Sequence, residues 1–341
     1  MKGKVWYMAI VAAVAILLIG EVTVYTDVYR SDSELILDSD GYGLVMDTNY
    51  SIDYLVMSSY SEVNSSPREF LIYRDVTYGS YLEDSYLDHT IRCFEDEFRI
   101  YNFMMYRIVD AAEVAEVLSG DLESKDASSH ALLFLSGVLP DTIYGDSELL
   151  EDWLALGGSV YWSGSTFGRY VAHPRSSENP VEEYDTDPGD RFLGVSGGIG
   201  MSQSDRRGSD PSADRYIGDV LNMFYDNCNY GVRSDVPDSL FIGYESEGYN
   251  SVSVCRYAGG TGQICIFGGR FPPSDMQTGH SNIIKVFISN ISYDSVFFDI
   301  IEGHKGSGSI GVQLSDDLIA GSVVYVYYGS MLGTYACAHR I

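Results

Sequence analysis

Short apolar runs alternate with segments of helical periodicity from residue 68 to residue 162, and this alternation restricts the possible folds more than any other feature. The run at 131–135 has no polar residue, as expected of a strand that is covered on both faces. The predicted strands are 70–73, 103–109, 131–135 and 159–162, and the predicted helices between them are 87–101, 110–118 and 146–156. We therefore predict an α/β fold with an open, mostly parallel sheet flanked by helices.

The helix predictions rest on spacing and on terminal residues. Apolar residues lie 4, 3, 4 and 3 positions apart, which places them on one helical face; they are Leu87, Ile91, Phe94, Phe98 and Tyr101. Asp110 is a suitable N-cap for the next helix, and Gly157 with Gly158 ends the third. Residues 164–211 are rich in Gly, Ser, Pro and Asp and are predicted to form a long loop region.

The rest of the α/β region is predicted as helices at 212–226 and 279–291, with an antiparallel extension of the sheet. The strands of that extension are 240–243, 251–257 and 263–267. On both flanks the pattern is β-rich: 33–37 with 43–46 reads as a hairpin, and further strands are expected at 52–57, 308–314, 323–328 and 334–338. We expect residues 27–67 and 304–341 to pair as a β-rich annex beside an α/β domain at 68–303.

Residues 5–20 carry no charge and follow Lys2 and Lys4. The segment 1–26 is predicted to be an uncleaved signal anchor that spans the membrane, with a cleaved signal peptide as the alternative. The two lysines orient the N-terminus toward the cytoplasm, so the bulk of the chain is expected to be extracytoplasmic. Three glycosylation sequons agree with that location and begin at Asn49, Asn64 and Asn290.

The charge balance excludes nucleic acid as a partner. The chain has 21 Lys+Arg against 49 Asp+Glu, a formal net charge of −28, whereas a phosphate-binding surface has to be basic. Because 45% of the residues are hydrophobic and 13% aromatic, the chain is expected to fold around a core.

The five cysteines form no CxxC pair, and we predict neither a metal site nor a cofactor. Cys255 and Cys265 flank a glycine-rich turn, where they would form either a disulfide or two buried thiols. The acidic residues around Asp38–Asp40 are interpreted as a turn, and those at 182–190 as a solvated loop.

The middle of the chain resembles the class I glutamine amidotransferase-like fold, including divergent members attached to some glycosidases. The resemblance covers roughly residues 68–292 and rests on 109–112 (VDAA), 131–140 (ALLFLSGVLP), 149–158 (LLEDWLALGG), 160–164 (VYWSG) and 262–270 (GQICIFGGR). It implies a flavodoxin-like parallel sheet. Catalytic members need a cysteine after the fourth strand, but this chain has Ser163-Gly-Ser165 there. The resemblance therefore implies a non-catalytic member.

Ligands in open α/β sheets bind beyond the carboxyl ends of the strands. The polar residues at or after such ends are the candidate ligand-binding residues: Asp75, Ser136, Ser163, Ser165 and Arg270. Arg169 and His173, in the following loop, are second-rank candidates. A G-x-S-x-G pattern at 194–198 places Ser196 as a possible hydrolase nucleophile, with His280, His304 or His339 as its base.

These observations predict a membrane-anchored, acidic protein of a prokaryotic cell envelope that binds an unidentified envelope ligand or protein and has no catalytic residue. The alternative is an extracellular serine hydrolase that acts on an ester, amide or glycan through Ser196 or Ser163. A purely structural envelope component is a third hypothesis. A serine within hydrogen-bond reach of a histidine that an acid also contacts would favour the hydrolase.

Overall fold

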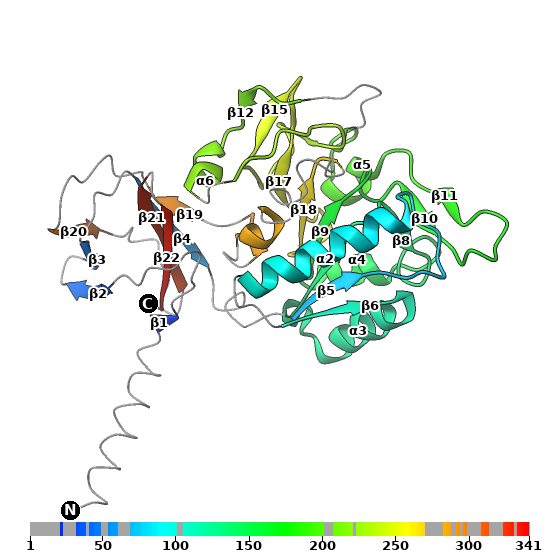
Figure 1. Cartoon of the computed structure of the whole chain (residues 1–341), viewed down its shortest axis with the longest axis horizontal. Coiled ribbons are helices and arrows are strands. Elements are labelled where there is room, and N and C mark those ends of the chain that lie inside the picture. The colour runs from blue at the N-terminus through cyan, green and yellow to red at the C-terminus, as the bar shows by residue number, and fades with distance from the viewer. Residues whose placement is uncertain are drawn as a thin grey trace, which may run out of the picture. The chain divides into compact units, whose positions relative to one another are not determined.

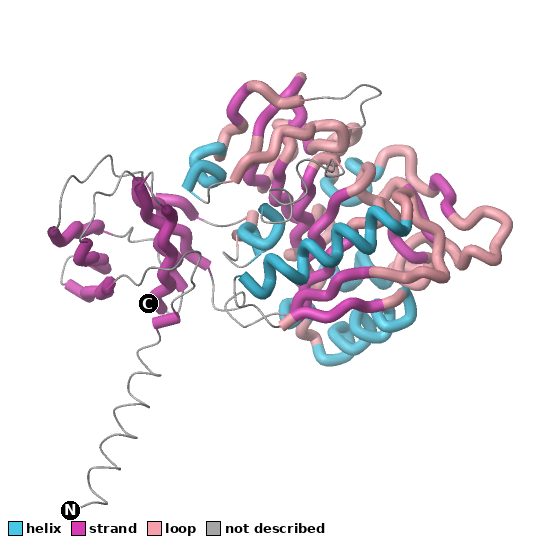
Figure 2. Tube along the Cα trace, viewed as in Figure 1, coloured by secondary structure: helices cyan, strands magenta, loops and turns pink. Residues whose placement is uncertain are grey.

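The chain divides into two compact units, Met1–Ser65 with Ser295–Ile341, and Ser66–Asp294. The computed structural model describes residues 21–22, 32–38, 41–48, 54–60, 69–100, 105–200, 207–220, 223–269, 282–287, 291–293, 296–298, 308–313, 323–330 and 333–340 (Figures 1 and 2). The asparagines of the three sequons, Arg270 and the apolar segment 5–20 lie outside these residues. No helix among the described residues is long and apolar enough to cross a bilayer. The extracytoplasmic location stays a prediction.

The first unit is built from strands at both ends of the chain. Its strands are β1 (Glu21–Val22), β2 (Asp32–Asp38), β3 (Gly41–Thr48), β4 (Tyr54–Tyr60), β19 (Val296–Phe298), β20 (Gly308–Gln313), β21 (Val323–Ser330) and β22 (Gly333–Arg340). They form a five-stranded sheet in the order β1-β22-β21-β4-β19 and a three-stranded sheet in the order β2-β3-β20. Every pairing is antiparallel, and the C-terminal strands β20 and β21 pair with the N-terminal strands β3 and β4.

The second unit contains a seven-stranded sheet in the order β14-β17-β18-β9-β7-β5-β6. These strands are β5 (Glu69–Tyr73), β6 (Tyr106–Val109), β7 (His130–Phe134), β9 (Ser159–Ser163), β14 (Ser239–Phe241), β17 (Val252–Arg256) and β18 (Gln263–Phe267). From β6 through β18 all neighbours are parallel. The predicted α/β class with a parallel sheet is therefore confirmed. The run 263–267 forms β18, which pairs in parallel with β9 and therefore belongs to the parallel part of the sheet. The antiparallel extension begins with the next strand, β17.

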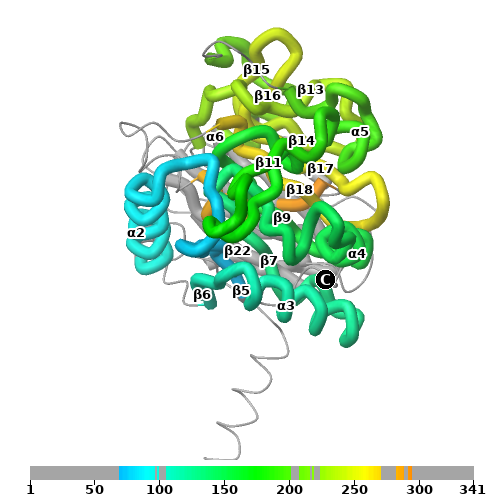
Figure 3. Tube along the Cα trace, turned by 90° about the vertical axis from the view of Figure 1, so that its right-hand side faces the viewer, coloured from blue at the N-terminus to red at the C-terminus, as the bar shows by residue number. Residues whose placement is uncertain are grey.

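Helices cover both faces of this sheet (Figure 3). On one face, Phe98 of α2 (Asp84–Ile100) and Phe287 of the helical residues 282–287 contact Phe70, with ring centroids 5.5 and 4.3 Å away. On the other face, α3 (Ala111–Ser124) and α4 (Leu149–Ala155) pack on the alternate residues of the same strands, including Trp162. Successive side chains of a strand point to opposite faces, and nearly all those of the central strands are buried, so both faces of the sheet are apolar.

The start of α3 confirms Asp110 as its cap. The Asp110 side chain accepts hydrogen bonds from the N–H groups of Ala112 and Glu113, and the Glu113 side chain accepts from the Asp110 N–H. This reciprocal capping box satisfies donors that the helix itself cannot pair. The predicted helix at 212–226 is shorter, since α6 spans only Arg215–Val220.

The predicted loop region 164–211 contains short elements instead. They are β10 (Tyr170–Ala172), β11 (Val181–Glu183), α5 (Pro188–Leu193) and β12 (Asp210–Pro211). β10 also pairs in parallel with β8 (Leu139–Pro140), which follows β7. A separate small sheet has the order β12-β15-β16-β13, with β13 at Val232–Arg233, β15 at Tyr244–Ser246 and β16 at Tyr249–Asn250.

Cys255 and Cys265 form no disulfide, and both side chains are buried. In the hairpin register, Cys255 lies opposite Ile264 and Cys265 lies opposite Val254. An offset of one residue sends the two side chains to opposite faces of the sheet. Burial raises the pKa of the Cys255 thiol to about 12. The alternative of two buried thiols is thus the correct one.

Candidate functional site

The candidate site lies at the carboxyl ends of β5 and β7. The chain leaves β5 toward β6 on one side and leaves β7 toward β9 on the other, so the connections diverge between these two neighbouring strands. Such a switch point is where open α/β sheets bind ligands. Three segments meet there: residues 74–83 after β5, residues 135–141 after β7, and the hairpin formed by β10 and β11.

Backbone hydrogen bonds hold the first segment against the hairpin. The Gly79 N–H donates to the His173 carbonyl at 2.9 Å, and the Arg175 N–H donates to the Thr77 carbonyl at 2.7 Å. A Cβ atom on Gly79 would lie 1.9 Å from the Pro180 carbonyl oxygen. Glycine is therefore required here because the two backbones approach too closely for any side chain.

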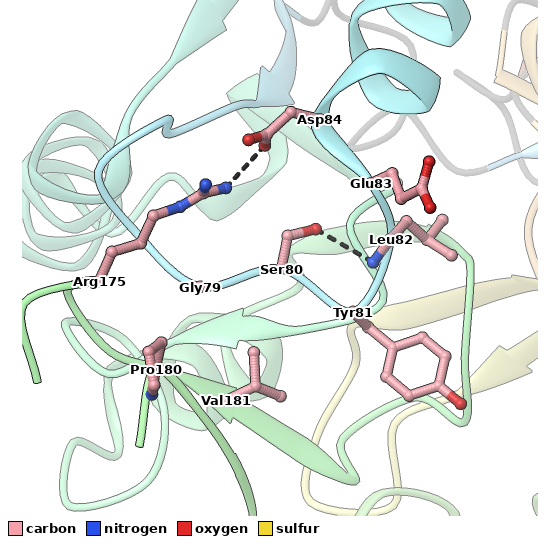
Figure 4. A pocket seen from close by; sticks show the side chains of 9 residues that line it. All are labelled: Gly79, Ser80, Tyr81, Leu82, Glu83, Asp84, Arg175, Pro180 and Val181. Atoms are coloured by element: carbon pink, nitrogen blue, oxygen red, sulfur yellow. Dashed lines mark hydrogen bonds and ion pairs between the residues drawn. The ribbon is translucent and has the colours of Figure 1, made fainter. Parts of the chain in front are cut away.

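An open pocket of about 460 Å³ lies between these segments (Figure 4). One wall is the turn that leads into α2, and the opposite wall is the end of the β10–β11 connection. Its lining residues are Gly79, Ser80, Tyr81, Leu82, Glu83, Asp84, Arg175, Pro180 and Val181. The pocket therefore offers an aromatic ring, a hydroxyl, two carboxylates and a guanidinium beside apolar side chains.

Asp84 organises the charges of the pocket. Its carboxylate accepts a hydrogen bond from Arg175 Nη2 at 2.7 Å and lies 3.1 Å from Arg74 Nη1. The hydrogen bond from Arg175 is the main cause of the lowered pKa of Asp84. Arg175 also donates from Nε to the Tyr78 carbonyl at 2.8 Å, so its guanidinium connects the hairpin to both the turn and the start of α2.

Tyr81 presents an aromatic surface at the pocket. The residue is 44% exposed, although it is a large aromatic. Its ring stacks on Tyr170 of β10, with centroids 5.1 Å apart and an interplanar angle of 26°. This stacking holds the Tyr81 ring in place, which lowers the entropic cost of ordering it around a ligand.

A hydrogen-bonded chain of side chains lies beside the pocket. Asp141 accepts from the Tyr78 hydroxyl, and its Oδ2 lies 2.7 Å from Nδ1 of His173. The Nε2 atom of His173 lies 3.5 Å from the Glu182 carboxylate. Burial, followed by the hydrogen bond to Asp141, raises the pKa of Tyr78 to about 12. The phenol therefore stays a hydrogen-bond donor at neutral pH.

Asp75 lies at this edge, as predicted, but it faces the protein backbone. Its carboxylate accepts from the Thr77 N–H at 2.8 Å, the Thr77 hydroxyl at 2.6 Å and the Ala111 N–H at 3.2 Å. Burial acts to raise the pKa of Asp75, but these hydrogen bonds outweigh it and the pKa is lowered. Asp75 thus fastens the turn to the start of α3.

The three serines predicted to bind ligand are buried, and their hydroxyls already donate hydrogen bonds to backbone carbonyls. The hydroxyl of Ser136 donates to the Val138 carbonyl at 3.1 Å, and that of Ser165 donates to the Gly137 carbonyl at 2.6 Å. The hydroxyl of Ser163 donates to the Gly269 carbonyl. Each serine therefore joins neighbouring backbone segments, because a buried hydroxyl needs a partner. The remaining candidate, Arg270, lies outside the described residues.

Ser196 does not sit in a nucleophile elbow. Helix α5, and not a strand, precedes it, and its hydroxyl donates to Asp187 at 2.5 Å. This bond is the main cause of the lowered pKa of Asp187. Among the histidines whose side chains the structure describes, none contacts Ser163, Ser165 or Ser196.

Sequence reasoning missed most of the site. Of the second-rank candidates, His173 lies in the chain of side chains beside the pocket, whereas Arg169 pairs with Glu183 at 2.8 Å. The residues without any sequence prediction are Tyr78, Tyr81, Asp84, Asp141 and Arg175. All lie in turns or irregular segments or at the first residue of a helix, where no periodicity marks them; only their nearness to strand ends was a usable signal.

Comparisons with known proteins add little to this geometry. No family model matches the chain, and no curated protein matches it. One similar solved structure is an exo-β-1,4-mannosidase from an Opitutaceae bacterium, with a TM-score of 0.32, 11% identity, and coverage of 67% of this chain and 35% of that one. Another is a GH42 β-galactosidase, with a TM-score of 0.35, 12% identity, and coverage of 81% and 41%. The chain spans less than half of either structure.

The predicted resemblance to the class I glutamine amidotransferase-like fold is wrong. The similar solved structures are described as glycoside hydrolases, and neither description names an amidotransferase. The quoted segments are instead general features of parallel α/β sheets. A buried central strand is apolar over its whole length, and a Gly-Gly pair after a helix serves to end that helix.

Proposed function

We propose that the α/β unit binds a neutral, hydroxyl-rich ligand, a saccharide, in the pocket between the 79–84 turn and the β10–β11 connection. The observation that carries this proposal is the exposed, stacked Tyr81 ring in a pocket that a guanidinium, two carboxylates and a hydroxyl also line, at the switch point of the sheet. Pockets with a few convergent polar groups at this position are the usual ligand sites of such sheets.

The chemistry of the lining favours a saccharide over an apolar or ionic ligand. A sugar ring has a face of C–H groups that packs on an aromatic ring, and hydroxyls around its rim that both donate and accept hydrogen bonds. Arg175 supplies donors, and Glu83 and Asp84 supply acceptors. Because Asp84 is already paired with Arg175 and Arg74, the pocket has no excess positive charge to select an anion.

The test is a binding titration of the full chain against soluble oligosaccharides, followed by NMR and by calorimetry. The panel includes β-mannosides and β-galactosides, the sugars named in the descriptions of the two similar structures. We expect saturable shifts of the amide signals at residues 79–84. Replacing Tyr81 with alanine should weaken binding about tenfold, since it removes an aromatic contact.

Phe224→Ala is the matched control, because Phe224 is a 56% exposed aromatic that does not line the pocket. It should leave the affinity unchanged. Equal affinity of the Tyr81→Ala variant and the wild type, or shifts confined to residues away from the pocket, would refute the proposal.

Hydrolysis of a glycosidic bond in the same pocket is the second candidate function. The observation in its favour is that two carboxyl groups, Glu83 and Asp84, line the pocket, and most glycosidases use a pair of carboxyl groups. Two guanidinium groups hold Asp84, which makes its carboxylate a poor nucleophile, so binding ranks first. If the chain releases reducing sugar and Glu83→Gln abolishes release while binding persists, hydrolysis replaces simple binding.

A further inference from the structure

His173 lies between two carboxylates at the edge of the pocket. Its Nδ1 atom is 2.7 Å from Oδ2 of Asp141, and its Nε2 atom is 3.5 Å from Oε2 of Glu182. Asp141 follows β8, His173 follows β10, and Glu182 belongs to β11. One imidazole ring thus connects three segments of the site.

The protonation state of His173 determines whether both contacts are favourable. A neutral imidazole carries one N–H and one lone pair, whereas the imidazolium carries two N–H groups. In the neutral form, one ring nitrogen therefore turns a lone pair toward a carboxylate, and the two repel. Only the imidazolium donates to Asp141 and faces Glu182 favourably at the same time.

The strand that Glu182 occupies forms part of the pocket wall. Val181 and Pro180, the residues just before Glu182, line the pocket. The backbone N–H of His173 donates to the Pro180 carbonyl at 2.9 Å, and the backbone N–H of Gly79 donates to the His173 carbonyl at 2.9 Å. His173 therefore contacts both walls through its backbone while its ring holds Glu182.

We propose that protonation of His173 fastens β11 against the site and tightens the pocket, so that ligand binding strengthens as the pH falls. The fastening of β11 needs no ligand, whereas the effect on ligand affinity rests on the proposed saccharide function. At high pH the Glu182 contact is lost, and the wall formed by Pro180 and Val181 opens more often.

The other charged and titratable groups around the ring agree with this assignment. Asp141 also accepts from the Tyr78 hydroxyl, and Asp75 and Asp110 add negative potential near Tyr78. Arg175, two residues along the chain, donates to Asp84, and Arg169 pairs with Glu183. The described groups that contact or surround the ring are thus predominantly carboxylates.

The chain provides a matched control at the opposite end of the sheet. His130, at the start of β7, has Nδ1 2.9 Å from Asp121 and Nε2 3.5 Å from Glu69. The geometry repeats that of His173, but this end of the strand is away from the pocket. His130→Gln therefore removes an equivalent pair of contacts without touching the pocket wall.

The experiment measures amide hydrogen exchange in residues 174–182 of the full chain between about pH 5.5 and 8, the range in which histidine changes charge. After correction for the intrinsic pH dependence of exchange, protection should be about threefold higher at the lower pH, as expected for one half-exposed ion pair. His173→Gln and Glu182→Gln should each remove this difference, and His130→Gln should keep it.

Persistence of the pH difference in His173→Gln, or its loss in His130→Gln, would overturn the proposal. So would an absent difference in the wild type. This measurement needs no ligand, so it can fail while saccharide binding holds, and it can succeed while the saccharide titration fails. Where a saccharide binds, its affinity should show the same roughly threefold change in the wild type and none in His173→Gln.

Discussion

The two ends of the central sheet contain the same group of side chains with different degrees of burial. At the amino end, His130 contacts Asp121 and Glu69, and the Asp121 side chain is 7% exposed. At the carboxyl end, His173 contacts Asp141 and Glu182, and the Asp141 side chain is 31% exposed. Asp121 also accepts from the indole N–H of the fully buried Trp153 at 2.9 Å.

The difference shows how one arrangement serves stability at one end and stays adjustable at the other. A buried carboxylate needs all its partners, because an unpaired buried charge or donor is expensive. A half-exposed carboxylate can exchange a partner for water at little cost. We therefore expect the contacts at the carboxyl end to change more readily than those of the buried Asp121 at the amino end.

The largest expected effect is that of Asp121→Ala. The change leaves the Trp153 N–H and the His130 ring without their buried acceptor, and it should lower the free energy of unfolding by about 3 kcal/mol. Asp141→Ala at the other end should cost less than about 1 kcal/mol. Urea denaturation of both variants makes the comparison, and equal losses would show that the two ends do not differ as described.

Gly79→Ala should have an intermediate effect that is concentrated at the site. The new Cβ would clash with the Pro180 carbonyl, so the turn and the hairpin must separate. This should lower the free energy of unfolding by about 2 kcal/mol. Saccharide binding should be lost along with the amide protection of residues 174–182.

Gly120→Ala is the control for that variant. Gly120 lies in α3, and a Cβ there meets nothing within 4 Å. Alanine should therefore stabilise the helix by about 0.5–1 kcal/mol. Calorimetric melting of the two variants should give shifts of opposite sign, and a destabilised Gly120→Ala would contradict the described environment of this glycine.

The smallest expected effect concerns acid. The pKa values of Asp75 and Asp84 at the carboxyl end are lowered in the folded chain. A lowered folded-state pKa stabilises the fold above the ordinary carboxyl pKa, and this contribution disappears as the pH falls through the lowered value. Protection of residues 74–84 should therefore fall below about pH 4, and less steeply in Asp84→Asn. An unchanged pH profile in that variant would contradict the pairing.

Several elements of the fold were predictable because their signals are local. The spacing from Leu87 to Phe98 gave α2, and Asp110 followed by Glu113 marked the start of α3. The uninterrupted apolar run near 131–135 gave β7 as a buried strand. The sequence left open whether Cys255 and Cys265 form a disulfide or two buried thiols, because a register offset of one residue is not visible in a glycine-rich turn.

The candidate site was predictable only as an edge of the sheet. The sequence placed Asp75 and the serines there correctly, but their side chains are used by the backbone. Tyr81 and Arg175 have no pattern of their own, since they lie in turns and not in elements of regular periodicity. The amino-acid composition of these turns does not indicate which of their side chains stay exposed.

The sequence alone determined the elements: periodicity sets helix and strand, capping residues set a helix end, and apolar content sets burial. The tertiary structure decided which turns meet. Tyr78, Asp141 and His173 come from three separate segments, and they lie together only because β5 and β7 are neighbours whose connections diverge. Strand order depends on packing over the whole sheet, so no local stretch of the chain specifies it.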